Sequence, residues 1–138
     1  MTTYPEYMVA PMREELNVAG FEQLRSAEEV NTILKSEGTV FLVVNSVCGC
    51  AAANARPAIA IAVKNEKTPT HLVTVFAGME KDAVDAARNA MLPYPPSSPA
   101  MALFKDGKLV HMIERHHIEG RRADMIADNL IQAFNEYC

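Results

Sequence analysis

Two cysteines separated by one glycine lie where a buried strand is predicted to give way to a helix. Residues 39–47 are almost continuously apolar and β-branched, and residues 51–56 are rich in alanine, which favours a helix. Cys48 and Cys50 therefore lie at the N-terminus of that helix. The helix dipole and the free backbone N–H groups there stabilise a thiolate and lower the pKa of a cysteine. This junction suits thiol–disulfide exchange at neutral pH.

Hydrophobic periodicity alternates between strand and helix along the whole chain. It predicts a helix over 6–18 with Met8, Met12 and Leu16 on one face, a short edge strand over 21–24, a helix over 26–38 and a strand over 39–45. There follow a helix over 50–65, a strand over 72–76, a helix over 81–91, a hairpin of strands 100–104 and 109–113, and a helix over 119–137. Pro57 should kink the 50–65 helix unless it lies near its start.

This order of elements predicts an α/β fold with a central mixed, mostly parallel sheet covered by helices on both faces. The hairpin adds an antiparallel strand. Cysteines after the first buried strand, a proline loop before the hairpin and a final helix together indicate a thioredoxin-like fold. The 6–18 helix would be an N-terminal extension to it.

The 138 residues are enough for one domain with its own core, and we expect residues 1–138 to form a single domain. A net charge of −4 argues against nucleic acid or an anionic membrane as a partner. The N-terminus lacks the basic start and apolar run of a signal peptide, and no stretch approaches the roughly 18 apolar residues of a membrane span. We therefore expect the cytoplasm, where a close cysteine pair is catalytic, redox-sensing or metal-binding more often than a structural staple.

The cysteine pair admits three interpretations. In thiol chemistry, Cys48 would be the exposed nucleophile and Cys50 the resolving partner, with Gly49 allowing the two sulfurs to approach. A metal site would need a remote ligand, since the sequence has no second cysteine pair. A purely structural role would make both cysteines small core residues.

Two further segments are candidates for substrate contact. The Ser98-Pro99 peptide bond, which leads into the hairpin, is predicted to be cis and to leave a backbone edge free for docking. Residues 114–117 (ERHH) close the hairpin: Arg115 suits a carboxylate, and His116 can transfer protons near neutral pH. The alternative for 114–117 is a solvated strand end and helix cap. We expect Arg56 to face solvent. Cys138 is a candidate resolving thiol or site of mixed-disulfide formation, but we expect it to be frayed in solvent and to have no role.

Four segments in combination resemble the bacilliredoxins, thioredoxin-like proteins with a Cys-Gly-Cys site. They are residues 45–51 (NSVCGCA), 73–78 (VTVFAG), 93–102 (PYPPSSPAMA) and 116–121 (HHIEGR). The resemblance covers essentially the whole chain. It departs from the expected pattern at His117, where we expect a residue other than histidine.

The resemblance implies an enzyme that removes bacillithiol, a small cysteine-containing thiol that replaces glutathione in some bacteria, from S-bacillithiolated cytosolic proteins. Cys48 would attack the bacillithiol sulfur, and Cys50 or a second bacillithiol would clear the adduct. No bound cofactor is implied, because bacillithiol acts as a co-substrate. A general disulfide isomerase or reductase is an alternative function, as is a metal-binding or redox-sensing Cys-x-Cys module.

Overall fold

A strand that is buried along its whole length lies at the centre of the fold. In the computed structural model, which describes residues 4–138, this strand is β2 (Thr39–Asn45). Phe41 and Val43 pack into the core on one face of the sheet, while Leu42 and Val44 pack on the other. Both faces are therefore covered, which explains why the segment has no polar alternation.

The sheet has five strands in the order β1-β3-β2-β4-β5. Their bounds are β1 (Glu22–Gln23), β3 (His71–Phe76), β4 (Ala100–Lys105) and β5 (Lys108–Ile113), beside β2. The β1–β3 and β2–β3 pairs are parallel, whereas the β2–β4 and β4–β5 pairs are antiparallel. The predicted mixed sheet is confirmed, and its antiparallel half begins already at β4 because that strand runs against β2.

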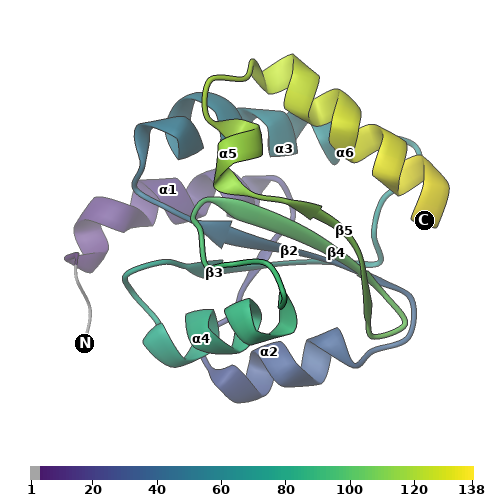
Figure 1. Ribbon diagram of the computed structural model, residues 1–138. Coiled ribbons are helices and arrows are strands. Elements are labelled where there is room, and N and C mark those ends of the chain that lie inside the picture. Colours follow the sequence, from purple (N-terminus) through teal and green to yellow (C-terminus); the bar gives the residue numbers. More distant parts are fainter. Residues whose placement is uncertain (1–3) are drawn as a thin grey trace.

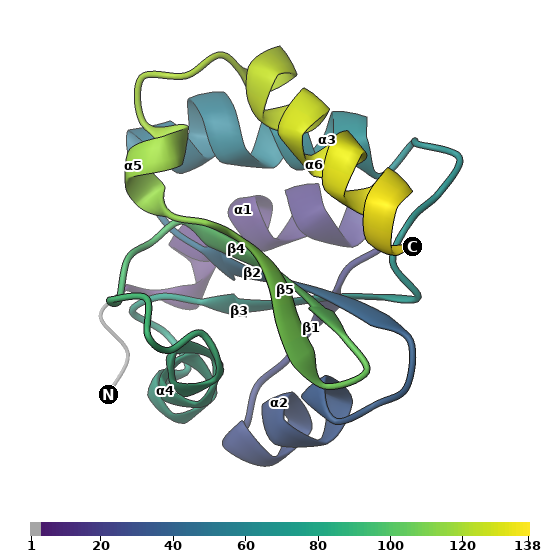
Figure 2. The same ribbon diagram turned by 45° about the vertical axis from the view of Figure 1, so that its right-hand side comes forward.

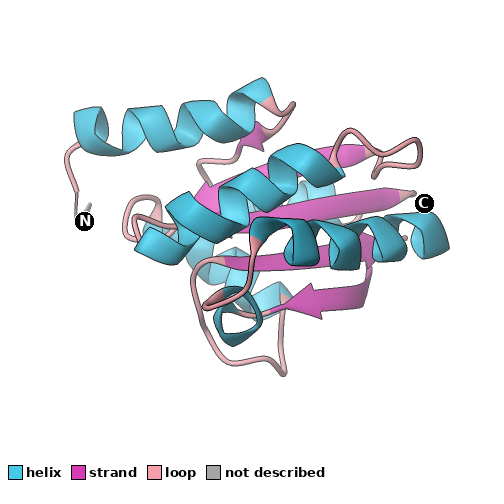
Figure 3. Ribbon diagram, turned by 90° about the horizontal axis from the view of Figure 1, so that it is seen from above, coloured by secondary structure: helices cyan, strands magenta, loops and turns pink. Residues whose placement is uncertain are grey.

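Helices form a layer on each face of the sheet (Figure 1). The layer in front of the sheet in Figure 3 contains α1 (Glu6–Val18), α3 (Arg56–Ala62) and α6 (Ala123–Tyr137), and the layer behind it contains α2 (Ala27–Leu34) and α4 (Lys81–Ala90). Two large apolar clusters, one on each face of the sheet, fill most of the core, and a small third one joins Val9 to Phe76 and Met79. Within residues 4–138, no helix combines the length and apolar character needed to cross a membrane.

The hairpin turn has the backbone that its sequence predicts. Asp106 and Gly107 both adopt positive φ, at 49° and 84°, as the two central residues of a type I′ turn require. Lys105 and Lys108 pair directly on either side of them. The Asp-Gly signal therefore fixes the pairing beside the turn, and the register of β4 against β5 shifts by one residue between Phe104 and Leu103.

The helix predicted over 119–137 begins later than expected. A separate short helix, α5 (Arg115–Ile118), follows β5, and α6 starts at Ala123. Glu119 is extended (ψ 128°) and Gly120 has a φ of 79°, so the chain turns before α6 begins. The predicted start at Glu119 is wrong because hydrophobic periodicity does not detect the short turn that separates the two helices.

The predicted apolar face of α1 is wrong in part. Its buried residues are Val9, Arg13 and Leu16, while Met8 is 41% exposed. The Arg13 guanidinium lies 5.2 Å from the centre of the Phe76 ring and pairs with carboxylates, so a cation occupies the inner face.

The helix predicted over 50–65 divides into two parts. A π-helical turn, η1 (Ala51–Ala55), precedes α3, and the Arg56 N–H donates to the carbonyl of Ala51. Pro57 has no N–H to donate and lies in the first turn of α3. Pro57 therefore lies near a helix start, the case in which no kink was expected. The helix type changes just before it, from the π-helical turn to the α-helix.

Candidate redox site

Sheet register brings three separate segments to one edge of the sheet. The cysteine turn follows the end of β2, where Val44 pairs with Ala100, the residue after Pro99. Ile113 at the end of β5 pairs with Met101, so the segment that begins at Glu114 starts beside the same edge. The predicted cysteine, proline and 114–117 candidates therefore meet, although they are far apart in the sequence.

The two cysteine sulfurs are in direct contact. Cys48 is partly exposed, Cys50 is buried, and both are free thiols with their Sγ atoms 2.7 Å apart. The backbone N–H of Cys50 also points at the Sγ of Cys48, at 3.4 Å. A movement of less than about 1 Å would bring the sulfurs to disulfide distance.

The environment separates the acidities of these thiols. The Cys50 thiol, the backbone N–H of Cys50 and the charge of Arg115 hold the pKa of Cys48 below its usual value. Burial, together with the thiol and charge of Cys48, raises the pKa of Cys50 to about 11. Cys48 is thus the thiol that ionises first, while Cys50 keeps its proton.

Arg115 links the thiols to the proline loop. Its backbone N–H donates to Ser97 Oγ at 3.3 Å, and its Nη1 donates to the carbonyl of Ser98 at 3.4 Å. Its Nε donates to the carboxylate of Glu119 at 2.8 Å. The Ser98-Pro99 bond is cis, as predicted from the sequence, and a second cis bond at Leu92-Pro93 was not anticipated.

Replacing Arg115 with glutamine is expected to move the midpoint of Cys48 alkylation to higher pH. Loss of the guanidinium removes a charge that favours the thiolate, so a higher pH is needed to ionise Cys48. Because Arg115 is half-exposed, raising the salt concentration should shrink the difference between wild type and Arg115→Gln. The rate of iodoacetamide addition against pH measures this, and unchanged midpoints at low salt would contradict it.

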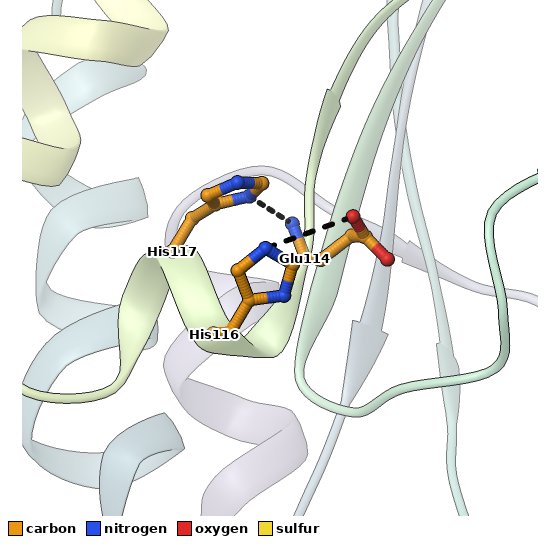
Figure 4. Close-up of side chains that lie close together, drawn as sticks. All are labelled: Glu114, His116 and His117. Carbon is orange, nitrogen blue, oxygen red and sulfur yellow. Dashed lines mark hydrogen bonds and ion pairs between the residues drawn. The ribbon is translucent and has the colours of Figure 1, made fainter.

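His116 belongs to a small polar group at the N-terminus of α5. Its Nε2 lies 3.9 Å from a carboxylate oxygen of Glu114, and its ring lies 4.0 Å from the ring of His117 (Figure 4). His117 Nδ1 accepts the backbone N–H of Glu114 at 3.1 Å. Residues 114–117 are therefore a helix cap as well as a neighbour of the thiols through Arg115.

Within residues 4–138, Glu114, His116 and His117 are the one group of three metal-type donors that lie close together. The group includes neither Cys48 nor Cys50. Because His117 Nδ1 accepts an N–H, the ring proton sits on Nε2, and binding a cation through either nitrogen would cost the cap bond. The donors therefore fit the capping role better than a metal.

Cys138 lies at the opposite end of the molecule from the cysteine turn. It follows α6, whose C-terminal end is remote from α5 in both views (Figures 1 and 2). Its thiol lies beside the Thr39 side chain, at the start of β2, whereas the cysteine turn follows the end of that strand. The residue is exposed, as expected, although burial of its thiol raises its pKa.

The expectation that Arg56 faces solvent is wrong. Arg56 is 4% exposed, and its guanidinium binds Glu15, Asn45 and Ser46. A signal for this was present in the sequence, since Arg56 is the one charged residue between Cys50 and Val63. A lone cation in an apolar helix requires buried partners, but the sequence does not identify them.

Thioredoxins are among the solved structures that superpose on this one. A mutant thioredoxin from Halobacterium salinarum superposes with a TM-score of 0.60 at 15% identity, covering 86% of this chain and 91% of that one. The thioredoxin of Trypanosoma brucei brucei gives 0.60 at 17% identity, covering 86% and 90%. At these identities the likeness establishes the thioredoxin fold alone.

Sequence comparison identifies the family within that fold. A family model described as disulphide isomerase matches residues 4–138. A bacilliredoxin of Cytophaga hutchinsonii is 57% identical over 133 residues, covering 96% of this chain and 98% of the relative. One from Geobacillus kaustophilus is 51% identical, covering 98% and 97%. The protein is thus a thiol–disulfide oxidoreductase with a thioredoxin fold. It belongs to the bacilliredoxin family.

Proposed function

We propose that this protein removes bacillithiol from S-bacillithiolated cytoplasmic proteins, with Cys48 as the nucleophile and Cys50 as the resolving thiol. The observation that carries this proposal is the difference between the two touching thiols: the pKa of Cys48 is lowered and that of Cys50 is raised to about 11. Cys48 is therefore the thiol that would attack first, and Cys50 lies beside it as the second thiol. The 57% identity to a protein named bacilliredoxin supports the choice of substrate.

In the first step, the Cys48 thiolate attacks the bacillithiol sulfur of the mixed disulfide. A Cys48–bacillithiol disulfide forms as the client–bacillithiol bond breaks, and the client leaves as a thiolate that takes a proton from water. The oxidation state of the system does not change, because one disulfide replaces another. The exposure of Cys48 relative to Cys50 favours Cys48 for this encounter.

In the second step, Cys50 gives up its proton and attacks the Cys48 sulfur. This forms the Cys48–Cys50 disulfide and releases bacillithiol, after which an external thiol reductant must restore the two thiols. A second bacillithiol could instead attack the bacillithiol sulfur of the adduct, leaving bacillithiol disulfide and the Cys48 thiolate. The 2.7 Å contact between the sulfurs supports the first route.

Substrate contact is proposed for Ser98, Pro99, Arg115 and His116. Arg115 supplies a half-exposed guanidinium that acts on Cys48, and it already holds the Ser98 carbonyl. His116 is 69% exposed and adds an imidazole that can donate or accept a hydrogen bond. We further propose that residues 1–138 work as one domain.

Isomerisation or reduction of protein disulfides is the second candidate. It needs the same nucleophile, and the description of the matching family model as disulphide isomerase favours it. Parallel assays with a bacillithiolated client and with a scrambled disulfide protein separate the two activities. Faster turnover of the scrambled protein would move the assignment to the second candidate.

Replacing Cys50 with alanine should trap the first intermediate. After one turnover with a bacillithiolated client, mass spectrometry should find bacillithiol on Cys48 of nearly every Cys50→Ala molecule, because the internal resolving thiol is missing. Wild-type protein treated in the same way should carry the Cys48–Cys50 disulfide instead. Client release without an adduct on Cys48 would overturn the proposed order of steps.

A further inference from the structure

A buried arginine, Arg56, is hydrogen-bonded to the two residues that lead into the cysteine turn. Its side chain bonds to neither cysteine. Arg56 Nη1 donates to the carbonyl of Ser46 at 2.9 Å and to Asn45 Oδ1 at 3.0 Å. The Arg56 side chain is 3% exposed. These hydrogen bonds end on Asn45 and Ser46, the two residues that lead into the cysteine turn, so they act on Cys48 through the backbone.

The hydrogen bonds continue from Arg56 to Cys48. Asn45 Oδ1 also accepts the backbone N–H of Ser46 at 2.9 Å, which fixes the first peptide of the turn. Ser46 Oγ in turn accepts the backbone N–H of Cys48 at 3.1 Å. A displacement of Arg56 would therefore be transmitted through Asn45 and Ser46 to the backbone of Cys48.

Helix α1 holds the other side of this network. Glu15 accepts from Arg56 Nε at 2.9 Å, and the carbonyl of Met12 accepts from Asn45 Nδ2 at 3.2 Å. The guanidinium thus donates hydrogen bonds to three residues at once: Glu15, Asn45 and Ser46. A lysine ammonium on a flexible stem lacks that planar fork, so it would not reproduce the arrangement.

We propose that Glu15 and Arg56 form a positioning pair through which the N-terminal helix holds residues 45–50 in the geometry that exposes Cys48 for attack. The proposal rests on Cys48 being the nucleophile. It gives α1 a part in the redox chemistry beyond covering the sheet. The Cys50 N–H lies 3.4 Å from Cys48 Sγ, and a movement of the turn that lengthened or tilted this bond would weaken a contact that lowers the pKa of Cys48.

The chain contains a matched control pair on the same helix. Glu6 of α1 accepts from Arg13 Nε at 3.0 Å, as Glu15 accepts from Arg56. The glutamates are 52% and 49% exposed, and the arginines are 4% and 3% exposed. Arg13, however, bonds to Gln23 and Glu80 rather than to the cysteine turn.

The test compares Glu15→Gln and Arg56→Lys with Glu6→Gln in the full-length protein. Two properties are measured: thermal stability, and the rate of iodoacetamide addition to Cys48 across pH, with mass spectrometry locating the label. We expect both Glu15→Gln and Glu6→Gln to lose stability, and Glu15→Gln to lose more, because Arg13 keeps its pair with Glu80 whereas Arg56 keeps the neutral partners Asn45 and Ser46. Only Glu15→Gln and Arg56→Lys should move the alkylation midpoint to higher pH and slow addition at pH 7, by about tenfold, because a ~1 Å displacement of a reacting group can cost more than that.

Each result has a distinct meaning. Unchanged Cys48 alkylation in both Glu15→Gln and Arg56→Lys would overturn the positioning role, as would an equal midpoint shift in Glu6→Gln. If Arg56→Lys does not fold, Glu15→Gln, which changes a half-exposed side chain, decides the matter alone. A wild-type Cys48 that resists alkylation at neutral pH would instead refute the proposed function itself.

Discussion

Replacing Cys48 with alanine is expected to reduce the release of client thiol to the rate measured without enzyme. Cys48 supplies the attacking sulfur, and Cys50 is buried, which by itself raises the pKa of its thiol and keeps the client away from it. Cys50 is therefore a poor substitute, and the loss should be at least about a thousandfold, as for other covalent nucleophiles. The measurement is the initial rate of release from a bacillithiolated client.

Cys138→Ala is the matched control for this experiment. Its thiol lies beside Thr39, and the seven residues of β2 separate that position from the cysteine turn. A strand of that length spans about 20 Å, so Cys138 cannot reach Cys48 within one molecule. Cys138→Ala should release client at the wild-type rate, and retained activity in Cys48→Ala would end the proposed mechanism.

Replacing Phe41 with alanine should cause a large loss of stability. Phe41 is 1% exposed, and its ring centre lies 5.3 Å from that of Phe134 and 5.9 Å from that of Phe21. Truncation removes the apolar contact between β2 and α6 and leaves a cavity, which costs about 3–5 kcal/mol of unfolding free energy. Denaturant titration measures this loss.

Two variants control for the chemistry of the Phe41 substitution. Phe41→Leu keeps most of the apolar contact and should lose less stability than Phe41→Ala. Tyr7→Ala removes an aromatic ring that is 83% exposed and should change stability by no more than about 0.5 kcal/mol. A loss below about 1 kcal/mol in Phe41→Ala would mean that this aromatic cluster does not hold the layer together.

The fold was accessible from the sequence because its main signals are local and repeated. β2 is apolar at almost every position, which marks a strand covered on both faces, and Asp106-Gly107 carries the turn residues of a hairpin. The errors occur where one residue overrides a pattern. Gly120 separates α5 from α6, and Arg13 takes the inner face of α1 where Met8 was expected.

The sequence predicts only those residues of the candidate site that belong to a recognisable local motif. The Cys-Gly-Cys tripeptide and the proline before β4 are visible in any reading of the chain. Glu15 and Arg56 are not, because their pairing depends on α1 crossing near the start of α3, 41 positions away. Glu119, which binds Arg115 and raises the pKa of Cys50, was missed because a carboxylate on a helical segment usually faces solvent.

The difference between the two thiols is the central claim, and site-resolved alkylation of the reduced wild-type protein tests it most directly. Iodoacetamide is added for a short, fixed time at a series of pH values, and fragmentation of the shared peptide locates the label on Cys48 or Cys50. The lowered pKa of Cys48 and the pKa of about 11 for Cys50 predict label on Cys48 alone at pH 7, with Cys50 unlabelled until strongly alkaline pH. Label that appears first on Cys50, or equally on both at neutral pH, would contradict the account.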